Sequence, residues 1–228
     1  MLDYFSPTVR EEHSEPHRPP TTGSFRLLSW NLLRRVGAGV DDVAALVAAH
    51  RPDLLLMQEA TAEIDALPTK IGGYYSRQPL PGRIHGLAAW SPTKLPEPDI
   101  LKLPHAKTKR ASYPRVAQVL RFEEAEIVNV HLSHGQLMLR RQLEEIADAV
   151  NGHSVVIGDF NAVGATELSG FRDVGPRQPT HFAKGVLPFR LDRCLVRGLD
   201  CVGAKALRRG PSDHRPIFID LMALSHRA

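Results

Sequence analysis

Cysteine is nearly absent from this chain of 228 residues, which contains only Cys194 and Cys201. Neither belongs to a CxxC pair, and no histidine and cysteine spacing is typical of a zinc site. The sequence therefore excludes a disulfide-stapled secreted fold and a structural zinc domain. We expect both thiols to be reduced and the protein to be cytoplasmic.

Long apolar runs are also missing. No stretch approaches the roughly 18 apolar residues that a spanning helix needs, so no membrane span is predicted. The N-terminal segment is polar, contains Pro16, Pro19 and Pro20, and lacks the apolar core of a secretory signal. We predict a flexible polar leader over residues 1–24, a single domain over residues 25–222 and a tail over residues 223–228, because a chain of this length can bury one large core.

Aromatic residues make up only 6% of the chain, which leaves few platforms on which nucleic-acid bases could stack. The formal net charge is +4 and the pI is near 9.3. This weak basicity favours an anionic ligand, and nucleic acid, a phospholipid headgroup or a phosphorylated metabolite would all fit. The most basic segment, residues 102–115, contains Lys102, Lys107, Lys109, Arg110 and Arg115, and we interpret its lysines as belonging to a solvated loop.

A short apolar run that ends in small polar residues is the most informative feature present. Residues 155–157 have the composition of a buried strand, and Gly158, Asp159, Phe160 and Asn161 follow directly. If the strand continues, its period of two points Asp159 and Asn161 to the same side. A carboxylate beside an amide suits a bound water, a metal ion or a phosphate, although Gly, Asp and Asn are also ordinary turn residues.

Other apolar segments end in the same way. Strands are predicted at residues 25–30, 54–57, 86–91, 116–122, 127–132, 191–196 and 217–221. Helices are predicted from a cap at Asp41 or Asp42, over residues 62–67 with a stop at Pro68, and over residues 137–150. Residues 72–85 are interpreted as a loop, and no strand is assigned within 162–188. A helix between two strands is typical of α/β proteins.

Polar side chains interrupt or end these predicted strands. Because strand ends gather at one edge of an α/β sheet, residues far apart in the sequence can line a single crevice. The set comprises Asn31, Glu59, His131, Asp159, Asn161, Asp192, Asp213 and His214. Its oxygen atoms suit a hard cation such as Mg²⁺, and its histidines can donate hydrogen bonds to a phosphoryl oxygen. Each residue alone also has a structural explanation, as a cap, a turn residue or an interior histidine.

Six motifs occur in a recognisable order: SWNL from Ser29, PDLLLMQEA from Pro52, VNVHLSHG from Val128, VVIGDFNA from Val155, LDRCLV from Leu191 and PSDHRPIF from Pro211. Together they resemble the endonuclease/exonuclease/phosphatase family, from about Phe25 to Leu221. The resemblance implies a four-layer α/β sandwich, in which two face-to-face mixed β-sheets are flanked by helices. It also implies metal-dependent hydrolysis of phosphate esters.

The resemblance further implies a metal site. Glu59 would be the main metal carboxylate, helped by Asn31, and Asp213 would be a further ligand. Mg²⁺ is the expected cofactor, with Mn²⁺ as a substitute.

The resemblance assigns the remaining residues to catalysis. Asp159 would hold or deprotonate the attacking water, and Asn161 would fix the phosphate or that water. His131 and His214 would donate hydrogen bonds to the phosphate, while Asp192 would fix the tautomer of His214 and raise its pKa. Arg115 would be a further phosphate contact.

The chain departs from the family pattern at Arg193, because many relatives have an aromatic residue after this aspartate. The resemblance therefore does not define the shape of the pocket next to Asp192. We expect a monomer that hydrolyses a phosphodiester in the manner of a nuclease, with DNA or RNA as substrate. A phospholipid or a small phosphorylated metabolite is the alternative substrate, and a non-catalytic anion-binding module is the alternative of another class.

Overall fold

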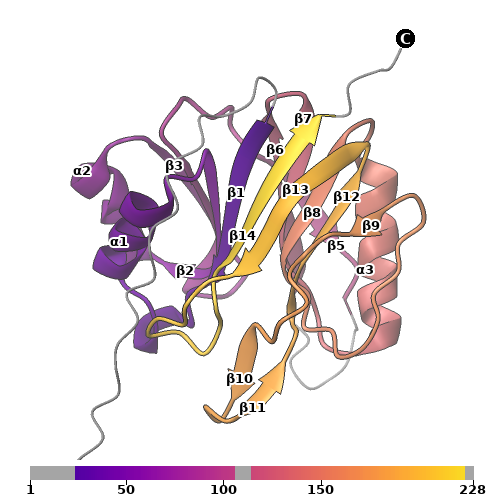
Figure 1. The fold of residues 1–228 in the computed structure, drawn as a ribbon. Coiled ribbons are helices and arrows are strands. Elements are labelled where there is room, and N and C mark those ends of the chain that lie inside the picture. Colours follow the sequence, from indigo (N-terminus) through magenta and orange to yellow (C-terminus); the bar gives the residue numbers. More distant parts are fainter. Residues whose placement is uncertain (1–23, 106–113, 224–228) are drawn as a thin grey trace, which may run out of the picture.

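The computed structural model describes residues 24–105 and 114–223, which form two six-stranded sheets packed face to face (Figure 1). Sheet A consists, in spatial order, of β13 (Leu199–Ala206), β14 (Ile217–Ala223), β1 (Ser24–Asn31), β2 (Leu54–Thr61), β4 (His85–Ser91) and β3 (Tyr74–Pro79). Sheet B consists of β5 (Asp99–Leu103), β6 (Arg115–Phe122), β7 (Ala125–His131), β8 (Ser154–Asp159), β12 (Asp192–Arg197) and β9 (Arg172–Asp173). Both sheets are mixed, because β1–β2 and β7–β8 are parallel and the other pairs are antiparallel.

Helices cover the outer face of each sheet. On the side of sheet A lie α1 (Val40–His50), α2 (Leu67–Ile71) and the 3-10 turns η1 (Arg34–Val36) and η2 (Ala62–Ala66), and α3 (Gln136–Ala149) lies on sheet B (Figure 1). The order of layers is helix, sheet A, sheet B, helix, so the predicted four-layer α/β sandwich is confirmed. None of the helices in the described ranges has the length and apolar character that crossing a bilayer requires.

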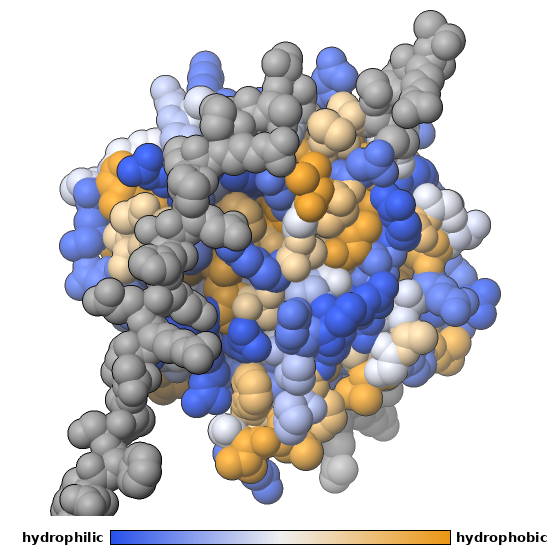
Figure 2. Space-filling model, in the orientation of Figure 1, coloured by the Kyte–Doolittle hydropathy of each residue, from blue (hydrophilic) through white to orange (hydrophobic). Residues whose placement is uncertain are grey.

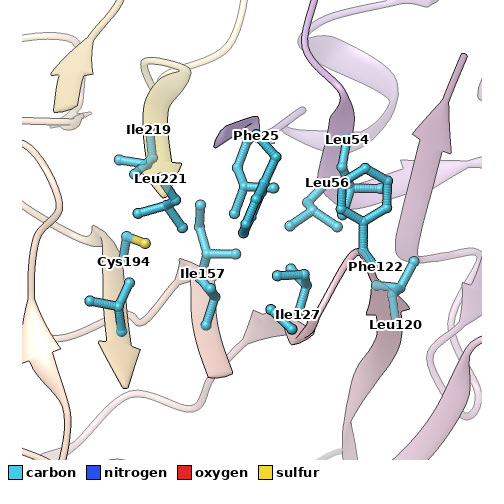
Figure 3. Packing of buried hydrophobic residues seen from close by; sticks show 14 of the residues in the cluster. Phe25, Leu54, Leu56, Leu120, Phe122, Ile127, Ile157, Cys194, Ile219 and Leu221 are labelled. Carbon is cyan, nitrogen blue, oxygen red and sulfur yellow. The ribbon is translucent and has the colours of Figure 1, made fainter. Parts of the chain in front are cut away.

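The alternation of side chains along the strands creates three apolar layers. Leu27 and Leu56 of sheet A face Ile127 and Ile157 of sheet B across the middle of the molecule (Figure 3). Their sequence neighbours point outward instead. Leu28 packs with α1, and Val128 and Val156 pack with α3. Every central strand is therefore buried on both faces, which explains its nearly continuous apolar sequence.

Some predicted boundaries were wrong. Helix α1 begins after Gly39 rather than at an aspartate cap, and the carboxylate of Asp42 accepts the N–H of Gly39 from the third helical position. Pro68 does not stop a helix but lies at the start of α2, where its missing N–H costs nothing.

Several strands were missed, and most of them lie at sheet edges. The predicted loop at residues 72–85 contains β3, the basic segment begins in β5, and β13 was not predicted. The unassigned region 162–188 contains β9, β10 (His181–Ala183) and the start of β11 (Leu187–Phe189). The β10–β11 hairpin projects below the sandwich (Figure 1), and the lower end of the molecule carries an apolar patch (Figure 2). Val186 and Leu187, at the turn of the hairpin, are exposed.

Some predictions lie outside the described residues. They include the leader except Ser24, the lysines Lys107 and Lys109 with Arg110, and the tail except Ala223. The two cysteines, Cys194 and Cys201, are free thiols.

Candidate active site

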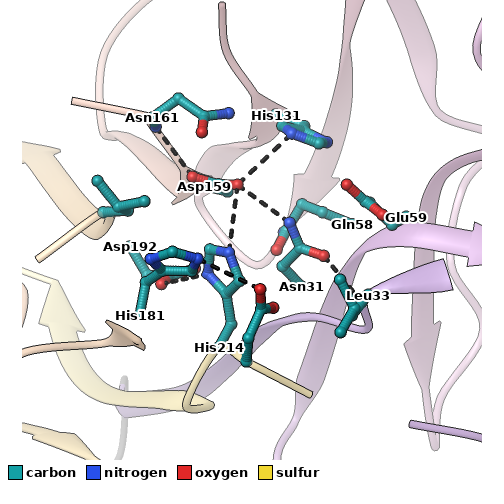
Figure 4. Close-up of polar contacts among 12 residues, drawn as sticks. Asn31, Leu33, Gln58, Glu59, His131, Asp159, Asn161, His181, Asp192 and His214 are labelled. Atoms are coloured by element: carbon teal, nitrogen blue, oxygen red, sulfur yellow. Dashed lines mark hydrogen bonds and ion pairs between the residues drawn. The ribbon is translucent and has the colours of Figure 1, made fainter. Parts of the chain in front are cut away.

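The predicted polar residues come together at one edge of the sandwich. The parallel strands β7 and β8 end at His131 and Asp159, which are register partners. The antiparallel strand β12 begins beside them, with Asp192 opposite Asp159. On sheet A, β1 ends at Asn31, and the segment that leads into β14 carries His214. Strand direction and register therefore bring distant parts of the sequence to one place (Figure 4).

Asp159 is the hub of this cluster. Asn31 Nδ2 donates to Asp159 Oδ2 at 3.0 Å, and the Nε2 atoms of His131 and His214 lie 3.5 and 3.8 Å from the same oxygen. The second oxygen, Oδ1, accepts the N–H of Asn161 at 2.9 Å. The carboxylate is buried, and this burial raises its pKa although His214 opposes the shift. Asp159 is therefore readier to accept a proton than an exposed aspartate.

His214 is held by a carboxylate on its other side. Its Nδ1–H donates to Asp192 Oδ2 at 2.8 Å, so Nε2 faces Asp159. Burial disfavours the imidazolium, but the charges of Asp192 and Asp159 outweigh it and raise the pKa of His214 to about 10. The ring is therefore a cation at neutral pH, with Nε2–H as a donor directed into the site.

His131 behaves in the opposite way. It is buried, and burial together with the positive charge of Arg115 holds the pKa of its imidazole well below the usual value. His131 is therefore neutral. Arg115 lies at the start of β6. Burial lowers the pKa of its guanidinium, and the negative charges of Asp159 and Glu59 oppose this shift. Both residues lie close enough to Asp159 to interact with its charge.

Glu59 reaches the site through a β-bulge. The pairing of β2 with β4 shifts between Met57 and Ala60, and Glu59 has a positive φ of 56°. A bulge re-aims a side chain in this way, and Figure 4 shows the Glu59 carboxylate directed toward the same space as Asn31 and Asp159. Burial raises the pKa of Glu59 despite Arg34, whose Nε lies 3.9 Å from Oε2.

Asn161 is placed differently from the prediction. Strand β8 ends at Asp159, so no strand period carries Asn161 to the same side. Asn161 instead adopts a left-handed φ of 49°, which asparagine tolerates, and its Nδ2 donates to the carbonyl of Leu132 at 3.0 Å. The residue belongs to the site through a turn that closes onto Asp159.

A divalent cation suits this donor set. Among the described residues, Asp159, Asp192 and His214 form one group whose ligand atoms lie within 4.8 Å of one another, and His181, Asp213 and His214 form a second. Neither group contains Glu59, and both contain His214, whose protonated ring cannot coordinate a metal ion, so their carboxylates are the candidate ligands. Asp192 Oδ1 and Asp213 Oδ1 are buried and have no hydrogen-bond partner in the described part of the chain. Such oxygen-rich, incompletely satisfied carboxylates are what Mg²⁺ or Mn²⁺ binds, so the residues fit the expected cofactor.

The sequence analysis did not identify His181 as a residue of the site. Its Nε2 lies 3.3 Å from Asp213 Oδ2, its ring centroid lies 4.5 Å from that of His214, and the two histidines form a β-bridge. Its hydrogen bond lowers the pKa of Asp213. His181 lies in the region without an assigned strand, where no sequence period indicated which way its side chain points.

A buried polar network supports the site between the two sheets. Gln58 of β2 donates to Asn129 Oδ1 of β7 at 2.8 Å and to Ser29 Oγ at 3.1 Å. Asn129 in turn donates to the carbonyls of Met57 and Ala88. These bonds cross the interface between the sheets beside Glu59, so they fix how the two halves of the site meet.

The fold and this cluster define an α/β sandwich protein with an acid and imidazole site at one sheet edge. A family model described as the endonuclease/exonuclease/phosphatase family matches residues 28–214, and the chain belongs to this family. The predicted family resemblance is thereby confirmed.

Solved structures share the fold at low sequence identity. An endonuclease/exonuclease/phosphatase from Bacteroides vulgatus has a TM-score of 0.73 at 17% identity, covering 88% of this chain and 99% of that chain. The human Nocturnin catalytic domain with bound sulfate has a TM-score of 0.65 at 18% identity, covering 88% and 93%. A humanized TDP2 of D. rerio has a TM-score of 0.66 at 15% identity, covering 87% and 98%. No curated protein sequence matches.

Proposed function

We propose that this protein is a Mg²⁺-dependent phosphodiesterase of the nuclease type, which hydrolyses its substrate with a water activated by Asp159. Membership of a family of nucleases and phosphatases supports a hydrolase of phosphate esters. The observation that carries the proposal is the position of one carboxylate oxygen, Asp159 Oδ2, within 3.8 Å of Asn31, His131 and His214.

In this proposal Asp159 takes the proton of the attacking water. Its burial raises the pKa of the carboxyl, which improves it as a base. Asn31 and the N–H of Asn161 hold the carboxylate in one orientation. Asn31 ends β1 and Asn161 follows β8, so both contacts belong to the folded chain and position the Asp159 carboxylate before substrate arrives.

The imidazoles bind the phosphoryl group from the other side. His214 is a cation and directs Nε2–H into the site, so it can donate to a phosphoryl oxygen as negative charge develops there. His131 is neutral and donates without adding charge. Arg115 adds a buried positive charge at the same edge. In the proposed reaction, Asp192 fixes the His214 ring.

Glu59, Asn31 and Asp213 would hold the cation. When bound, Mg²⁺ would neutralise charge on the phosphate and on the leaving oxygen. The raised pKa of Glu59 supports this role, since a buried carboxylate without a full counter-charge gains from a cation.

Turnover of bis-p-nitrophenyl phosphate with Mg²⁺ or Mn²⁺ tests the proposal. We expect EDTA to abolish turnover and Asp159→Ala and His214→Ala to reduce it at least roughly 100-fold each, the usual size of a general-base contribution. Asp200→Ala is the control, because this half-exposed side chain pairs with Arg172 and not with a residue of the site. Turnover that survives EDTA, or that survives both alanine substitutions, would contradict the proposal.

The substrate is then identified with a panel of nicked and abasic DNA, RNA, sphingomyelin and inositol phosphates, each run with metal and with the Asp159→Ala variant. We expect a nucleic acid to be the best substrate. Binding of a ligand without any metal requirement and without product would instead support a non-catalytic module.

A further inference from the structure

A cavity lies on the outer face of sheet B, behind the strand β12 that carries Asp192. It has a volume of about 510 Å³, which is the size of ordinary small-molecule sites. Its lining includes Val163, Thr166, Arg177, Phe189, Arg190 and Arg193. Arg193 follows Asp192 on β12, and because side chains alternate along a strand the two residues point to opposite faces.

Two residues of the cavity lining carry buried donors that have no partner in the described part of the chain. The Arg193 side chain is only 4% exposed, and its Nε has no hydrogen-bond partner among the described residues. The hydroxyl of Thr166 is likewise buried and unpartnered. Leaving such groups unsatisfied costs free energy, so a ligand that reached them would gain by pairing with them.

The charge of the lining favours an anion. Three arginines, Arg177, Arg190 and Arg193, surround Asp173, whose oxygens accept from Arg190 at 2.7 Å twice and from Arg193 at 3.3 Å. With Glu167 as the remaining carboxylate of the lining, the arginines still outnumber the acids. The guanidinium of Arg177 lies 3.7 Å from the Asp173 carboxylate and donates to the Asp173 carbonyl at 3.2 Å. Its side chain is 75% exposed, so a ligand in the cavity can reach it from solvent.

Aromatic rings connect the cavity to the active site. Phe189 lines the cavity, and the centroid of its ring lies 6.3 Å from that of the His181 ring. The His181 ring in turn lies 4.5 Å from that of His214. On the other side, Val163 follows Asn161 by two residues, a distance of at most about 7 Å along the chain.

We infer that this cavity binds the nucleotide next to the scissile phosphate of a polynucleotide, with its phosphate near Arg177 and Arg193 and its base against Phe189. The inference rests on the proposed function, and it names the class of substrate. A flat, anionic unit matches guanidinium groups, a hydroxyl and one ring, and stacking on a single aromatic side chain is tolerant of sequence.

The test measures binding without hydrolysis. The anisotropy of a fluorescein-labelled single-stranded oligothymidylate is followed in EDTA with wild type, Arg177→Ala and Thr166→Val. Arg193 is left intact because its guanidinium also binds the carbonyls of Ala162 and Gly164 and holds the loop in place. The matched control is Arg172→Ala, a similarly exposed arginine outside this cavity.

We expect Arg177→Ala to weaken binding roughly tenfold and to reduce the salt slope by about 0.7, the contribution of one phosphate contact to a single strand. Thr166→Val should also weaken binding, and Arg172→Ala should not. Absence of binding by wild type, unchanged binding in both cavity variants, or equal weakening by Arg172→Ala would overturn the inference.

A small diester separates this inference from the proposed function. Bis-p-nitrophenyl phosphate has no neighbouring nucleotide, so its turnover by the wild type reports on the proposed function alone. If the oligonucleotide binds as expected and the small diester is not hydrolysed, the proposed function fails while the cavity assignment stands. If the diester is hydrolysed and the oligonucleotide does not bind, the cavity assignment fails alone.

Discussion

Asp192 lies directly opposite Asp159 in the pairing of β12 with β8, yet the side chain that joins them belongs to the other half of the molecule. His214, which precedes β14 of sheet A, donates to Asp192 through Nδ1 and faces Asp159 through Nε2. Its backbone is fixed as well, since Ser212 Oγ accepts its N–H and Trp30 Nε1 donates to its carbonyl. The site thus depends on how the two sheets pack.

Asp192→Asn should lower the pKa of His214. In the wild type this pKa is about 10, because burial, which lowers it, is outweighed by Asp192 and Asp159. The substitution keeps the shape of the side chain and removes its charge, so we expect a fall of roughly one unit or more. Titration of the His214 ring by NMR in EDTA measures this change in pKa. Asp200→Asn, whose carboxylate pairs with the exposed Arg172, is the control, and an unchanged His214 titration in Asp192→Asn would contradict the assignment.

The same pair should make stability depend on pH. The folded pKa of His214 lies above the unfolded value of 6.5, so the protonated ring stabilises the fold fully below pH 6.5. This contribution should be lost progressively as the pH rises toward 10. Urea unfolding in EDTA across this range measures the decline, which should be shallower in Asp192→Asn. An equally steep decline in both proteins would show that titratable groups other than His214 cause the pH dependence of stability.

Glu59→Gln should remove the stabilisation by metal without loosening the fold. Burial raises the pKa of Glu59, so an amide of the same shape relieves a desolvation cost. We expect Mg²⁺ to raise the Tm of wild type and to have little effect on Glu59→Gln, whose Tm in EDTA should equal or exceed that of wild type. Glu124→Gln, on the exposed turn between β6 and β7, should keep the metal response. A full metal response in Glu59→Gln would exclude Glu59 as a main ligand.

Asn129→Ala should destabilise the contact between the two sheets. The substitution leaves Gln58 Nε2 without its 2.8 Å acceptor and opens a small cavity. The free energy of unfolding should fall by about 2–4 kcal/mol. Denaturant unfolding checks this, with the exposed substitution Asn151→Ala expected to stay within about 0.5 kcal/mol of wild type. Equal stability of the two variants would show that the hydrogen bonds of Asn129 do not stabilise the fold.

Gly158→Ala should be among the most damaging small substitutions. A Cβ at this position would collide with the carbonyl oxygen of Val130, and Gly158 has a φ of 140°, which other residues rarely adopt. We expect a loss of about 2 kcal/mol or more and displacement of Asp159. Gly203→Ala in β13, where a Cβ meets no atom within 4 Å, is the matched control. Similar unfolding midpoints for both would disprove the close approach.

Arg193 shows how a departure from a family pattern becomes interpretable in three dimensions. From the sequence, an arginine after the aspartate left the pocket undefined. In the structure it is buried, pairs with Asp173 and lines the cavity on the outer face of sheet B. Distant residues such as Asp173 have no pattern that links them to β12, so the sequence could not identify this partner.

The sequence by itself determined the central strands, the α3 helix, the sandwich fold and the residues at the strand ends. Its apolar runs are long enough to specify buried strands, and the order of its motifs identified the family. The roles of Glu59, Asp159 and the other site residues, the cofactor and the cytoplasmic location stay predictions.

Only the tertiary structure decided the edge strands β3, β5 and β13, the bulge at Glu59, the turn at Asn161 and the contacts of His181. Edge strands are partly exposed and lack a strong period, and a bulge or a left-handed turn depends on what packs against it. Local sequence fixes which side chains are available at the ends of strands. The packing of two sheets fixes which of them meet, because that depends on contacts between residues more than 100 positions apart, as for Asn31 and Asp159.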